Sequence, residues 1–382
     1  MSKLEELINK LCPNGVEFKK LSEVCNSLKK GTLKTSDLNA NGKYPVINSG
    51  RELYGFYDEY NNKNAITIAA RGEYAGYISY FENEFWAGGL CYPYSSKNEE
   101  FITNKFLYYY LKKNENKIME NLVARGSIPA LNKSDLDRFL VPVPPLEVQC
   151  EIVRILDNFT LLSAELSAEL SARQKQYEYY RDELLTFNKK DENVKWEELG
   201  KYCQRLKGTA ITARSMKEIN KENGKIRIFA GGKTMINTTE HNIPSSDIIR
   251  IPNIIVQSRG IIDFIYYEKP CSFKREMWSY THTNSVTLKF IYYYLKKNIE
   301  YFKQRGNQMG SMPQISLEVT EKFKIPLPSM NKQERIVNIL DRFDKLCNDL
   351  SEGLPAEIEA RKKQYEYYRD KLLTFKELKD NE

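Results

Sequence analysis

The sequence has little histidine, no paired cysteine motif and no long apolar run, and each shortage excludes a class of protein. Its 382 residues include two histidines, His241 and His282, too few for a histidine-based metal centre. Seven cysteines are scattered without a CxxC pair, which favours reduced, buried thiols over a disulfide framework or a zinc ribbon. No apolar run approaches the roughly 20 residues of a membrane helix, and the charged start MSKLEELINKLC does not resemble a secretory signal. We therefore expect a cytoplasmic protein that holds no metal.

Catalytic signatures are also missing. Gly232-Lys233-Thr234 ends like a phosphate-binding loop, but Arg227 stands where that motif requires its first glycine. No GxGxxG occurs, and the Pro-Pro pair at 144–145 lacks the Asn or Asp and the aromatic residue of an amino-methylating enzyme. We therefore expect no cofactor and no catalysis by this chain alone.

What is present is an internal duplication. Residues 172–187, ARQKQYEYYRDELLTF, return at residues 360–375 as ARKKQYEYYRDKLLTF, with 14 of 16 positions identical. Such a match, 188 residues apart, cannot result from composition, so the two halves share one plan. Further matched segments are QCEIVRILDNF (149–159) with QERIVNILDRF (333–343), VPVP (141–144) with IPLP (325–328), FLYYYLKKN (106–114) with FIYYYLKKN (290–298), Gly-Ser-x-Pro at 126–129 and 310–313, Val16-x-Phe18-x-x-Leu21 with Val194-x-Trp196-x-x-Leu199, and Arg71-Gly72 with Arg259-Gly260.

Charge divides unevenly between the segments. Residues 1–145 have a net charge of +2 and residues 189–328 of +10, while the remaining two segments together have −5. A polyanion is the expected partner of the basic segments, and protein is the expected partner of the acidic ones. For residues 1–145 an ordinary solvated surface explains the small excess equally well.

The first and third segments combine strand and helix patterns. Residues 65–70 and 74–81 are rich in β-branched and aromatic residues and predict strands of one sheet. Apolar residues at three- and four-residue spacing predict one helix over 103–122, with the tyrosines at 108–110 in the core. The prolines of 141–146 then mark a domain boundary. The third segment repeats the pattern, with strands over 253–258 and 262–268 and a helix over 290–302.

The second and fourth segments predict long helices. Residues 146–188 predict a helix about 60 Å long, and the apolar stripe on this helix needs a partner helix. Within it, SAELSAEL (163–170) repeats every four residues, so one unit more or less changes the length by about 6 Å and turns the stripe by only about 40°. The fourth segment continues the stripe through Leu346 and Leu350, and Gly353-Leu354-Pro355 predicts a break before the next helix.

We therefore expect an α+β fold with a pseudo-twofold duplication. Two α/β globular domains, residues 1–145 and 189–328, are joined by two long antiparallel coiled-coil helices, residues 146–188 and 329–382. The candidate positions for helix pairing or partner contact are Leu156, Leu166, Leu170, Tyr177, Tyr180, Leu184, Leu340, Tyr365, Tyr368 and Leu372.

Arginine beside glycine marks the candidate DNA contacts. Arg71 and Arg259 each precede a glycine directly after a predicted strand, where a loop can approach DNA phosphates and bases closely. An ordinary turn accounts for a single Arg-Gly pair nearly as well. The full candidate set is Arg71, Arg125, Ser127, Lys133, Arg259, Arg305 and Ser311.

In this combination the chain resembles the specificity subunit of type I restriction–modification systems. The resemblance is carried by PPLEVQCEIVRILD (144–157), QERIVNILD (333–341), the two QYEYYRDxLLTF ends and the SAEL tandem. It implies that the globular segments are target recognition domains, each reading one half of a split site in double-stranded DNA. It also implies that the helices set the spacer and dock two adenine-N6 methyltransferase subunits, that endonuclease–translocase subunits join them, and that this subunit does no chemistry.

Because the two globular segments have diverged, we expect unlike half-sites and an asymmetric bipartite target. Two alternatives stay open from the residues alone. One is a structural coiled-coil adaptor whose globular domains bind proteins, and the other is a cryptic nuclease or methyltransferase.

Overall fold

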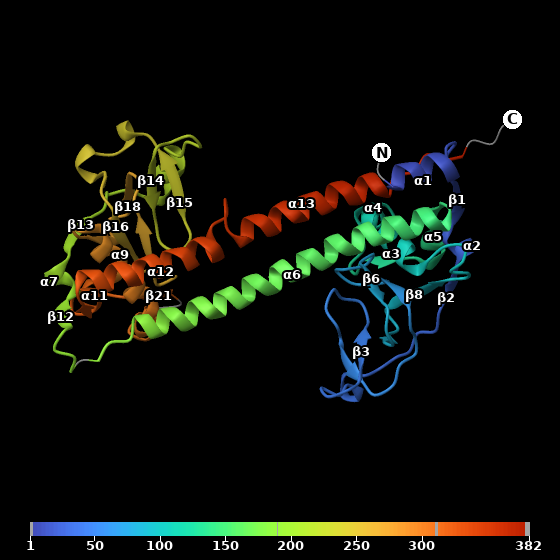
Figure 1. Cartoon of the computed structure of the whole chain (residues 1–382), viewed down its shortest axis with the longest axis horizontal. Helices are drawn as coiled ribbons and strands as arrows, with labels where there is room; N and C mark the ends of the chain where they lie inside the picture. Colours follow the sequence, from blue (N-terminus) through green and yellow to red (C-terminus); the bar gives the residue numbers. More distant parts are fainter. Residues whose placement is uncertain (1–2, 189, 310–311, 379–382) are drawn as a thin grey trace. The chain divides into compact units, whose positions relative to one another are not determined.

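Figure 1 shows the computed structural model of the chain, which describes residues 3–188, 190–309 and 312–378. Its contacts divide the chain into two compact units. Unit 1 comprises Met1–Ser167 and Glu357–Glu382, and unit 2 comprises Ala168–Ala356. Each unit therefore combines one globular domain with parts of both helical segments.

The globular domain of unit 1 is built on two small sheets. The first has the strand order β2-β8-β5-β6, with all neighbours antiparallel, and the second has the order β4-β3-β7, in which β3 pairs antiparallel with β4 and parallel with β7. Two further antiparallel pairs join β1 to β11 and β9 to β10. The strands are β1 (Glu17–Lys20), β2 (Cys25–Ser27), β3 (Tyr44–Ile47), β4 (Gly55–Tyr57), β5 (Ala65–Ala69), β6 (Ile78–Phe81), β7 (Trp86–Ala87), β8 (Cys91–Ser96), β9 (Val123–Ala124), β10 (Ala130–Leu131) and β11 (Leu140–Val143), and the helices are α1 (Lys3–Leu11), α2 (Leu21–Val24), α3 (Asn104–Lys113), α4 (Glu115–Asn121) and α5 (Lys133–Asp137), with a 3₁₀ turn at Thr35–Asp37.

Unit 2 repeats this plan strand for strand. Its sheets have the orders β13-β19-β16-β17 and β15-β14-β18, with β14 again antiparallel to one neighbour and parallel to the other. The strands are β12 (Lys195–Glu198), β13 (Gln204–Lys207), β14 (Ile226–Phe229), β15 (Met235–Thr238), β16 (Asn253–Gln257), β17 (Asp263–Tyr267), β18 (Cys271–Phe273), β19 (Trp278–Thr281), β20 (Asn307–Met309), β21 (Met312–Gln314) and β22 (Lys324–Leu327), and the helices are α7 (Leu199–Tyr202), α8 (Ala213–Glu218), α9 (Ser285–Lys297), α10 (Ile299–Gln304) and α11 (Leu317–Glu321), with 3₁₀ turns at Glu240–Asn242 and Ser245–Asp247.

In each domain the central strand of the larger sheet packs against a helix on one face and against the smaller sheet on the other. Every residue of β5 is buried, and successive side chains of a strand point to opposite faces. Ile66 and Ile68 pack in the core cluster that contains Phe106 of α3, whereas Ala65 packs with Phe85 beneath the smaller sheet. In unit 2, β16 is equally buried and divides its side chains in the same way between α9 and the smaller sheet.

The long helices follow the prediction. Residues 146–184 form one helix, α6, and the fourth segment forms α12 (Met330–Asn348) and α13 (Leu354–Leu372), interrupted where Gly353 and Pro355 predict the break. A Cβ at Gly353 would lie 2.6 Å from the carbonyl oxygens of Lys345 and Asp349, so only glycine allows the chain to pass so close to the end of α12. The prolines of VPVP and IPLP lie in β11 and β22 instead of a helix, as expected.

Within each unit the two long segments pack antiparallel. In unit 1, Phe159 of α6 stacks on Tyr368 of α13, with ring centroids 5.5 Å apart, and also contacts Tyr365 at 6.4 Å. Further along α6, Ser163 shares a surface hollow with Ile358, nearer the start of α13. In unit 2, Tyr180 stacks on Phe343 of α12 at 5.6 Å and Tyr177 contacts the same ring at 6.2 Å.

An aspartate present in both halves binds the long helix that follows each globular domain to that domain. In unit 1, Asp157 of α6 accepts a hydrogen bond from Tyr109 Oη at 2.6 Å and pairs with Lys105 Nζ at 2.8 Å, both on α3. Hydrogen bonds to a charged group contribute about 1.5–3 kcal/mol each. In unit 2 the same contacts join Asp341 of α12 to Tyr293 Oη at 2.5 Å and Lys289 Nζ at 2.9 Å, both on α9.

A lysine present in both halves contacts the C-terminal end of the other long helix of its unit. Lys113 Nζ, at the end of α3, donates to the carbonyl of Leu373 at 3.0 Å and contacts Thr374 Oγ1 at 2.7 Å, so a cation meets the terminal carbonyls of α13. Burial lowers the pKa of Lys113. In unit 2, Lys297 makes the matching contacts at the end of α6, with the carbonyl of Asp182 and with Thr186 Oγ1, and burial lowers its pKa as well.

Several details of the sequence prediction were wrong. The helix placed at 290–302 begins at Ser285 and is divided at Asn298 into α9 and α10, because the Asn298 side chain donates to the carbonyl of Tyr294. The strand placed at 74–81 begins only at Ile78, because Gly76 has φ of +93° and residues 74–77 form a turn. The helix placed at 103–122 is divided at Asn114 into α3 and α4, because the Asn114 side chain donates to the carbonyl of Tyr110 and ends the first helix. Leu350 lies outside α12 and is 83% exposed, so the stripe does not extend to it, and Leu346 is 37% exposed.

Of the tyrosines expected in the core, Tyr109, Tyr293 and Tyr294 are buried, whereas Tyr108, Tyr110 and Tyr292 are half-buried against the same cores. All seven cysteines are free thiols, and all but the exposed Cys150 are buried. Within residues 3–188, 190–309 and 312–378, no helix is long and apolar enough to cross a membrane. In the same ranges no group of three or more His, Cys, Asp or Glu residues is placed to hold a metal ion.

Candidate nucleic-acid interface

The matched Arg-Gly turns lie beside the proline of Gly-Ser-x-Pro and the residue after it in both units. In unit 1 the backbone of Arg71 pairs with Ala130, and Gly72 N donates to the carbonyl of Pro129 at 3.0 Å. In unit 2, Arg259 pairs with Gln314, and Gly260 N donates to the carbonyl of Pro313 at 2.9 Å. Segments about 60 residues apart in the sequence thus form one surface, and they do so twice.

The glycine of each turn is required by its backbone. Gly72 has φ of +95° and Gly260 of +77°, in the left-handed region that favours glycine. A Cβ at Gly72 would meet nothing within 4 Å, so the requirement there is conformational and not steric. The turn therefore presents Arg71, or Arg259, outward beside an open backbone that a ligand can approach.

A third loop joins the same surface in each unit. Residues 48–54 connect β3 to β4, and residues 230–234 connect β14 to β15. In unit 2, Gly232 N donates to the carbonyl of Arg259 at 3.3 Å, and Gln257 Nε2 donates to the carbonyl of Gly232 at 2.6 Å. In unit 1 the Arg51 guanidinium lies 4.9 Å from the ring centroid of Tyr74, in the turn after Arg71.

A Lys-Gly-Thr segment and the loop before the next strand complete the surface. Gly31 N donates to the carbonyl of Ala87 at 2.8 Å and Lys30 Nζ to the carbonyl of Gly89 at 3.1 Å. In unit 2, Thr209 N donates to the carbonyl of Phe273 at 2.8 Å. A Cβ at Gly208 would lie 2.0 Å from that carbonyl oxygen, so close approach requires glycine there. We call these five loops the loop face: residues 29–32, 48–54, 71–74, 88–90 and 125–129 in unit 1, and residues 207–209, 230–234, 259–261, 274–277 and 312–314 in unit 2.

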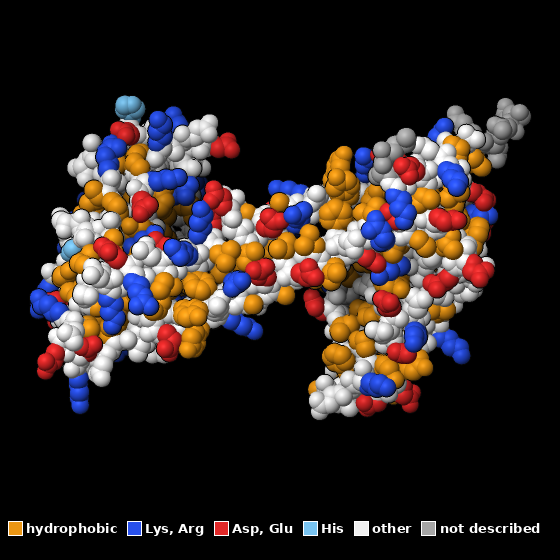
Figure 2. All heavy atoms as spheres, in the orientation of Figure 1, with side chains coloured by type: hydrophobic (Ala, Val, Ile, Leu, Met, Phe, Trp, Pro, Cys, Tyr) orange, Lys and Arg blue, Asp and Glu red, His pale blue; other side chains and the backbone are white. Residues whose placement is uncertain are grey.

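The loop face of unit 2 is strongly basic. It has Lys207, Lys233, Arg259, Lys274 and Arg275 against one acidic residue in those loops, Glu276. Figure 2 shows lysine and arginine side chains gathered over the part of unit 2 that holds β14, β15 and β18, whereas over unit 1 they alternate with acidic side chains. The loop face of unit 1 also has five cations, against two acidic residues, so the difference between the net charges of +10 and +2 arises mainly outside the loops; these residues are Lys29, Lys30, Arg51, Arg71, Arg125, Glu52 and Glu73.

The predicted arginines occupy different environments. Arg71 and Arg125 are exposed, and within the described residues the structure records no side-chain ion pair or hydrogen bond for either. Arg259 Nη2 donates to Gln314 Oε1 at 3.0 Å, which holds its guanidinium at the loop face. Arg305 follows α10 and stacks on Tyr301, with its guanidinium 3.6 Å from the ring centroid.

The other predicted polar residues divide further. Ser127 is exposed in the loop at 125–129, and Ser311 lies outside the residues that the structure describes. Lys133 Nζ pairs with Asp137 at 2.7 Å and lies over the ring of Tyr94, whose hydroxyl donates to the same carboxylate. Burial and this hydrogen bond raise the pKa of Tyr94. Lys133 thus has a structural partner that Arg71 and Arg125 lack.

The positions predicted for helix pairing or partner contact differ in how deeply they are buried. Leu156 and Leu340 are fully buried against the domain cores. Leu184 and Leu372 are partly buried beside those cores, and the four tyrosines make the stacking contacts described above. Leu166 and Leu170, in the SAEL tandem, are half-buried on α6.

Four residues of the loop face were missed. Arg51 and Lys233 each follow a glycine in the loop between paired strands, and the aligned segments VINSGRE (46–52) and IFAGGKT (228–234) carried that signal. Ile128 and Met312 occupy the matched position of Gly-Ser-x-Pro and are 66% and 55% exposed, so each loop carries an apolar side chain beside its cations.

Comparisons with known proteins agree with this architecture. A family model described as the type I restriction modification DNA specificity domain matches residues 13–173 and 188–360. The type I restriction enzyme EcoR124I/EcoR124II specificity subunit of Escherichia coli is 31% identical, over 98% of this chain and 97% of that protein. A putative type I restriction enzyme specificity subunit of Haemophilus influenzae is 29% identical, over 94% of this chain and 96% of that protein.

A solved structure shows the same fold. The crystal structure of a type I restriction–modification S subunit from M. genitalium matches with a TM-score of 0.70 at 20% identity, over 98% of this chain and 99% of that one. The fold expected from the duplication is therefore confirmed.

Proposed function

Because the chain belongs to the type I restriction–modification DNA specificity family, we propose that each loop face reads one half of an asymmetric, bipartite site in double-stranded DNA. The family role is recognition of a DNA sequence and assembly of the restriction–modification complex, as the sequence predicted. The observation that carries the finer proposal is the repeated loop face: the same five loops, on the same strand order, present different side chains in the two units.

The loop faces combine the two kinds of contact that reading DNA requires. Exposed Arg71, Arg125, Lys233 and Arg259 suit phosphates or the edges of guanine, which guanidinium and ammonium groups bind in the major groove. Exposed Ile128 and Met312 suit apolar contacts with bases, such as the thymine methyl group or a partly unstacked step. Since Ile and Met differ in shape, and their neighbours differ too, the two faces would prefer unlike sequences.

The helix ends carry a second duplicated surface. Tyr179 in unit 2 and Tyr367 in unit 1 are each 62% exposed, although their neighbours Tyr180 and Tyr368 stack inward. The exposed residues around them, Glu and Asp one before and three after, are the same in both copies. One surface present once in each unit suits two copies of one partner, and we propose two adenine-N6 methyltransferase subunits there, with endonuclease–translocase subunits joining that complex.

The recognition role is tested by selecting bound sequences from a random DNA pool, with the chain alone and with its methyltransferase subunit. We expect two short unlike motifs at one fixed spacing. Exchange of residues 1–143 for the matching segment of another specificity subunit should replace one motif and leave the other. Salt-sensitive binding without any motif would contradict sequence recognition, and unchanged motifs after the exchange would favour a protein-binding adaptor.

The cationic and apolar residues of unit 2 should affect binding differently. Lys233→Gln and Arg259→Gln should each reduce the magnitude of the negative slope of log K against log salt by roughly 0.9, the contribution of one phosphate contact in B-DNA. Met312→Ser should leave that slope unchanged and reduce the preference for the selected motif over random DNA about tenfold, since one good base contact is worth about 1–3 kcal/mol. Lys201→Gln on α7, away from the loop face, is the matched control, and an equal slope change there would argue for a diffuse basic surface.

The spacer between half-sites should follow the SAEL tandem. Deleting residues 167–170 removes about 6 Å of helix, or at most about two steps of 3.4 Å along DNA, and should shorten the selected spacer while leaving both motifs unchanged. We expect the interruption between α12 and α13 to absorb the missing turn. The control replaces Ser167 and Glu169 by Ala, which keeps the length. A change in the motif letters themselves would exclude this mechanism.

The exposed tyrosines should determine the number of methyltransferase subunits. Tyr179→Glu alone, or Tyr367→Glu alone, should reduce the complex from two methyltransferase copies to one, and the double variant should remove both, as measured by native mass spectrometry. Tyr60→Glu, at another exposed tyrosine, should leave two copies bound. Two copies bound to each single variant and to the double variant would place the partner surface elsewhere.

A further inference from the structure

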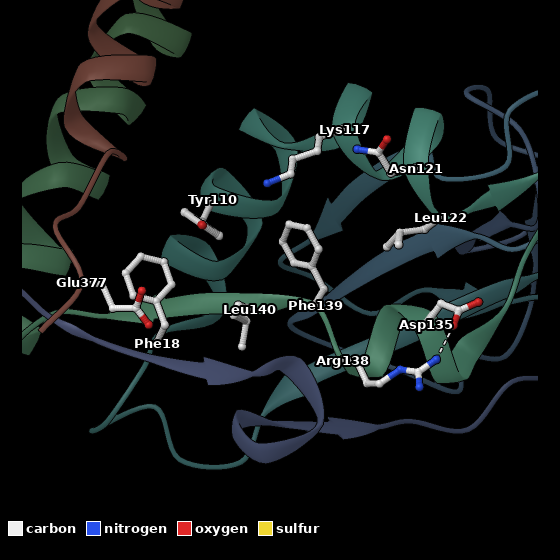
Figure 3. A pocket seen from close by; sticks show the side chains of 10 residues that line it. All are labelled: Phe18, Tyr110, Lys117, Asn121, Leu122, Asp135, Arg138, Phe139, Leu140 and Glu377. Atoms are coloured by element: carbon white, nitrogen blue, oxygen red, sulfur yellow. Dashed lines mark hydrogen bonds and ion pairs between the residues drawn. The ribbon is translucent and has the colours of Figure 1, made fainter. Parts of the chain in front are cut away.

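Unit 1 has an open pocket beside the sheet formed by β1 and β11. Its volume is about 570 Å³, and its walls come from β1, β11, α3, α4, α5 and the segment after α13. Figure 3 shows Phe139 and Tyr110 on the floor, Phe18 beside Glu377 at one end, and Lys117 with Asn121 above the ring of Phe139. The pocket therefore combines an aromatic floor with a polar rim.

The matched place in unit 2 is filled by its own side chains. At an offset of 184, Tyr110 and Phe139 correspond to Tyr294 and Phe323, whose rings lie 5.9 Å apart. Tyr301 packs on Phe323 at 5.0 Å and Arg305 lies on the other face of Tyr301 at 3.6 Å. Aromatic pairs at such distances contribute about 0.5–1.5 kcal/mol beyond their burial.

Unit 1 lacks the last two members of this stack. Lys117 stands in place of Tyr301, and Asn121 stands in place of Arg305, so the ring of Phe139 has no aromatic neighbour on that side. Phe139 and Tyr110 are consequently only partly buried, whereas Phe323 and Tyr294 are 7% and 9% exposed. The pocket is thus the space that a tyrosine fills in the other half of the same chain.

The polar residues at the rim of the pocket indicate which chemical group should accompany an aromatic ring bound there. Within the described residues, the structure records no ion pair or hydrogen bond for Lys117 or Asn121. Arg138, by contrast, pairs with Asp135 at 2.5 Å, so its charge is already compensated. Glu377 lies beside Phe18, at the other end of the pocket from Lys117. The unpaired ammonium and amide at the Lys117 end therefore suit a carboxylate next to an aromatic side chain.

We propose that this pocket binds an aromatic side chain flanked by a carboxylate, presented by a protein that docks once on the chain. A protein side chain is the occupant because a protein tyrosine fills the matched space in unit 2, and buried aromatic anchors are typical of protein interfaces. It docks once because Tyr301 occupies the matched space in unit 2. The duplicated tyrosine surface takes paired partners, whereas this pocket is specific to unit 1.

The test uses the full chain and the peptide acetyl-Glu-Tyr-Glu-amide, with acetyl-Glu-Ala-Glu-amide and acetyl-Lys-Tyr-Lys-amide as controls. Saturation-transfer NMR and titration should show saturable binding of the Glu-Tyr-Glu peptide at one site per chain. The alanine peptide and the lysine peptide should each bind at least tenfold more weakly. Absence of tyrosine-dependent binding would overturn the proposal.

Two variants locate the binding. Lys117→Tyr with Asn121→Arg rebuilds the stack of unit 2 and should weaken the Glu-Tyr-Glu peptide at least tenfold. Tyr301→Lys with Arg305→Asn opens the matched space in unit 2 and should raise the stoichiometry from one peptide to two. Thermal melting checks that each variant folds. Unchanged peptide affinity in a folded Lys117→Tyr/Asn121→Arg variant would overturn the assignment of this pocket.

DNA binding separates this inference from the proposed recognition role. Lys117→Tyr with Asn121→Arg should leave the selected DNA motifs unaltered, because neither residue belongs to the loop face. Loss of peptide binding with unchanged motifs supports the pocket as a separate site, and loss of both motifs in that variant would instead assign Lys117 and Asn121 to DNA contact.

Discussion

The contact on which both units depend is the half-buried meeting of a domain helix with two long helices. Asp157 and Asp341 bind a tyrosine and a lysine of α3 and α9, and Lys113 and Lys297 bind the ends of α13 and α6. Each contact joins residues from two different segments, so a change on one side leaves a polar group of the other side without its partner. This explains why FxYYYLKKN, ILD and LLTF persist in both halves while the loops between them differ.

Much of the architecture could be predicted because it is encoded by local, repeated signals. The 3.6-residue stripe of residues 146–184, the prolines of VPVP and the glycine and proline before α13 each act through the backbone near them, and the predicted helix, extended segments and break are present. The errors arose where one side chain or one backbone angle decides. Asn114 ends α3 through its own side chain, and the turn at Gly76 depends on a positive φ that residue patterns do not reveal.

The loop face was only partly predictable for the same reason. The duplication marked Arg71 and Arg259 because both halves keep the glycine that a left-handed turn needs. Arg51 and Lys233 were missed because the loops that carry them differ in length, and only the paired strands on either side reveal their equivalence. Lys133, another candidate, has its ammonium paired with Asp137 while its side chain stays 42% exposed.

The two halves are not equivalent everywhere, and the places where they differ affect how many copies of a partner can bind. Where both copies expose the same residues, as at Tyr179 and Tyr367, one chain offers two like surfaces. Where one copy fills a space with Tyr301 and the other leaves it open beneath Lys117, the chain offers a single surface. A duplicated scaffold can therefore hold paired partners through what its halves share and unpaired ones through a change of two side chains. Such a change costs little in the fold, because the anchoring contacts of α3 and α9 lie on other residues and remain intact.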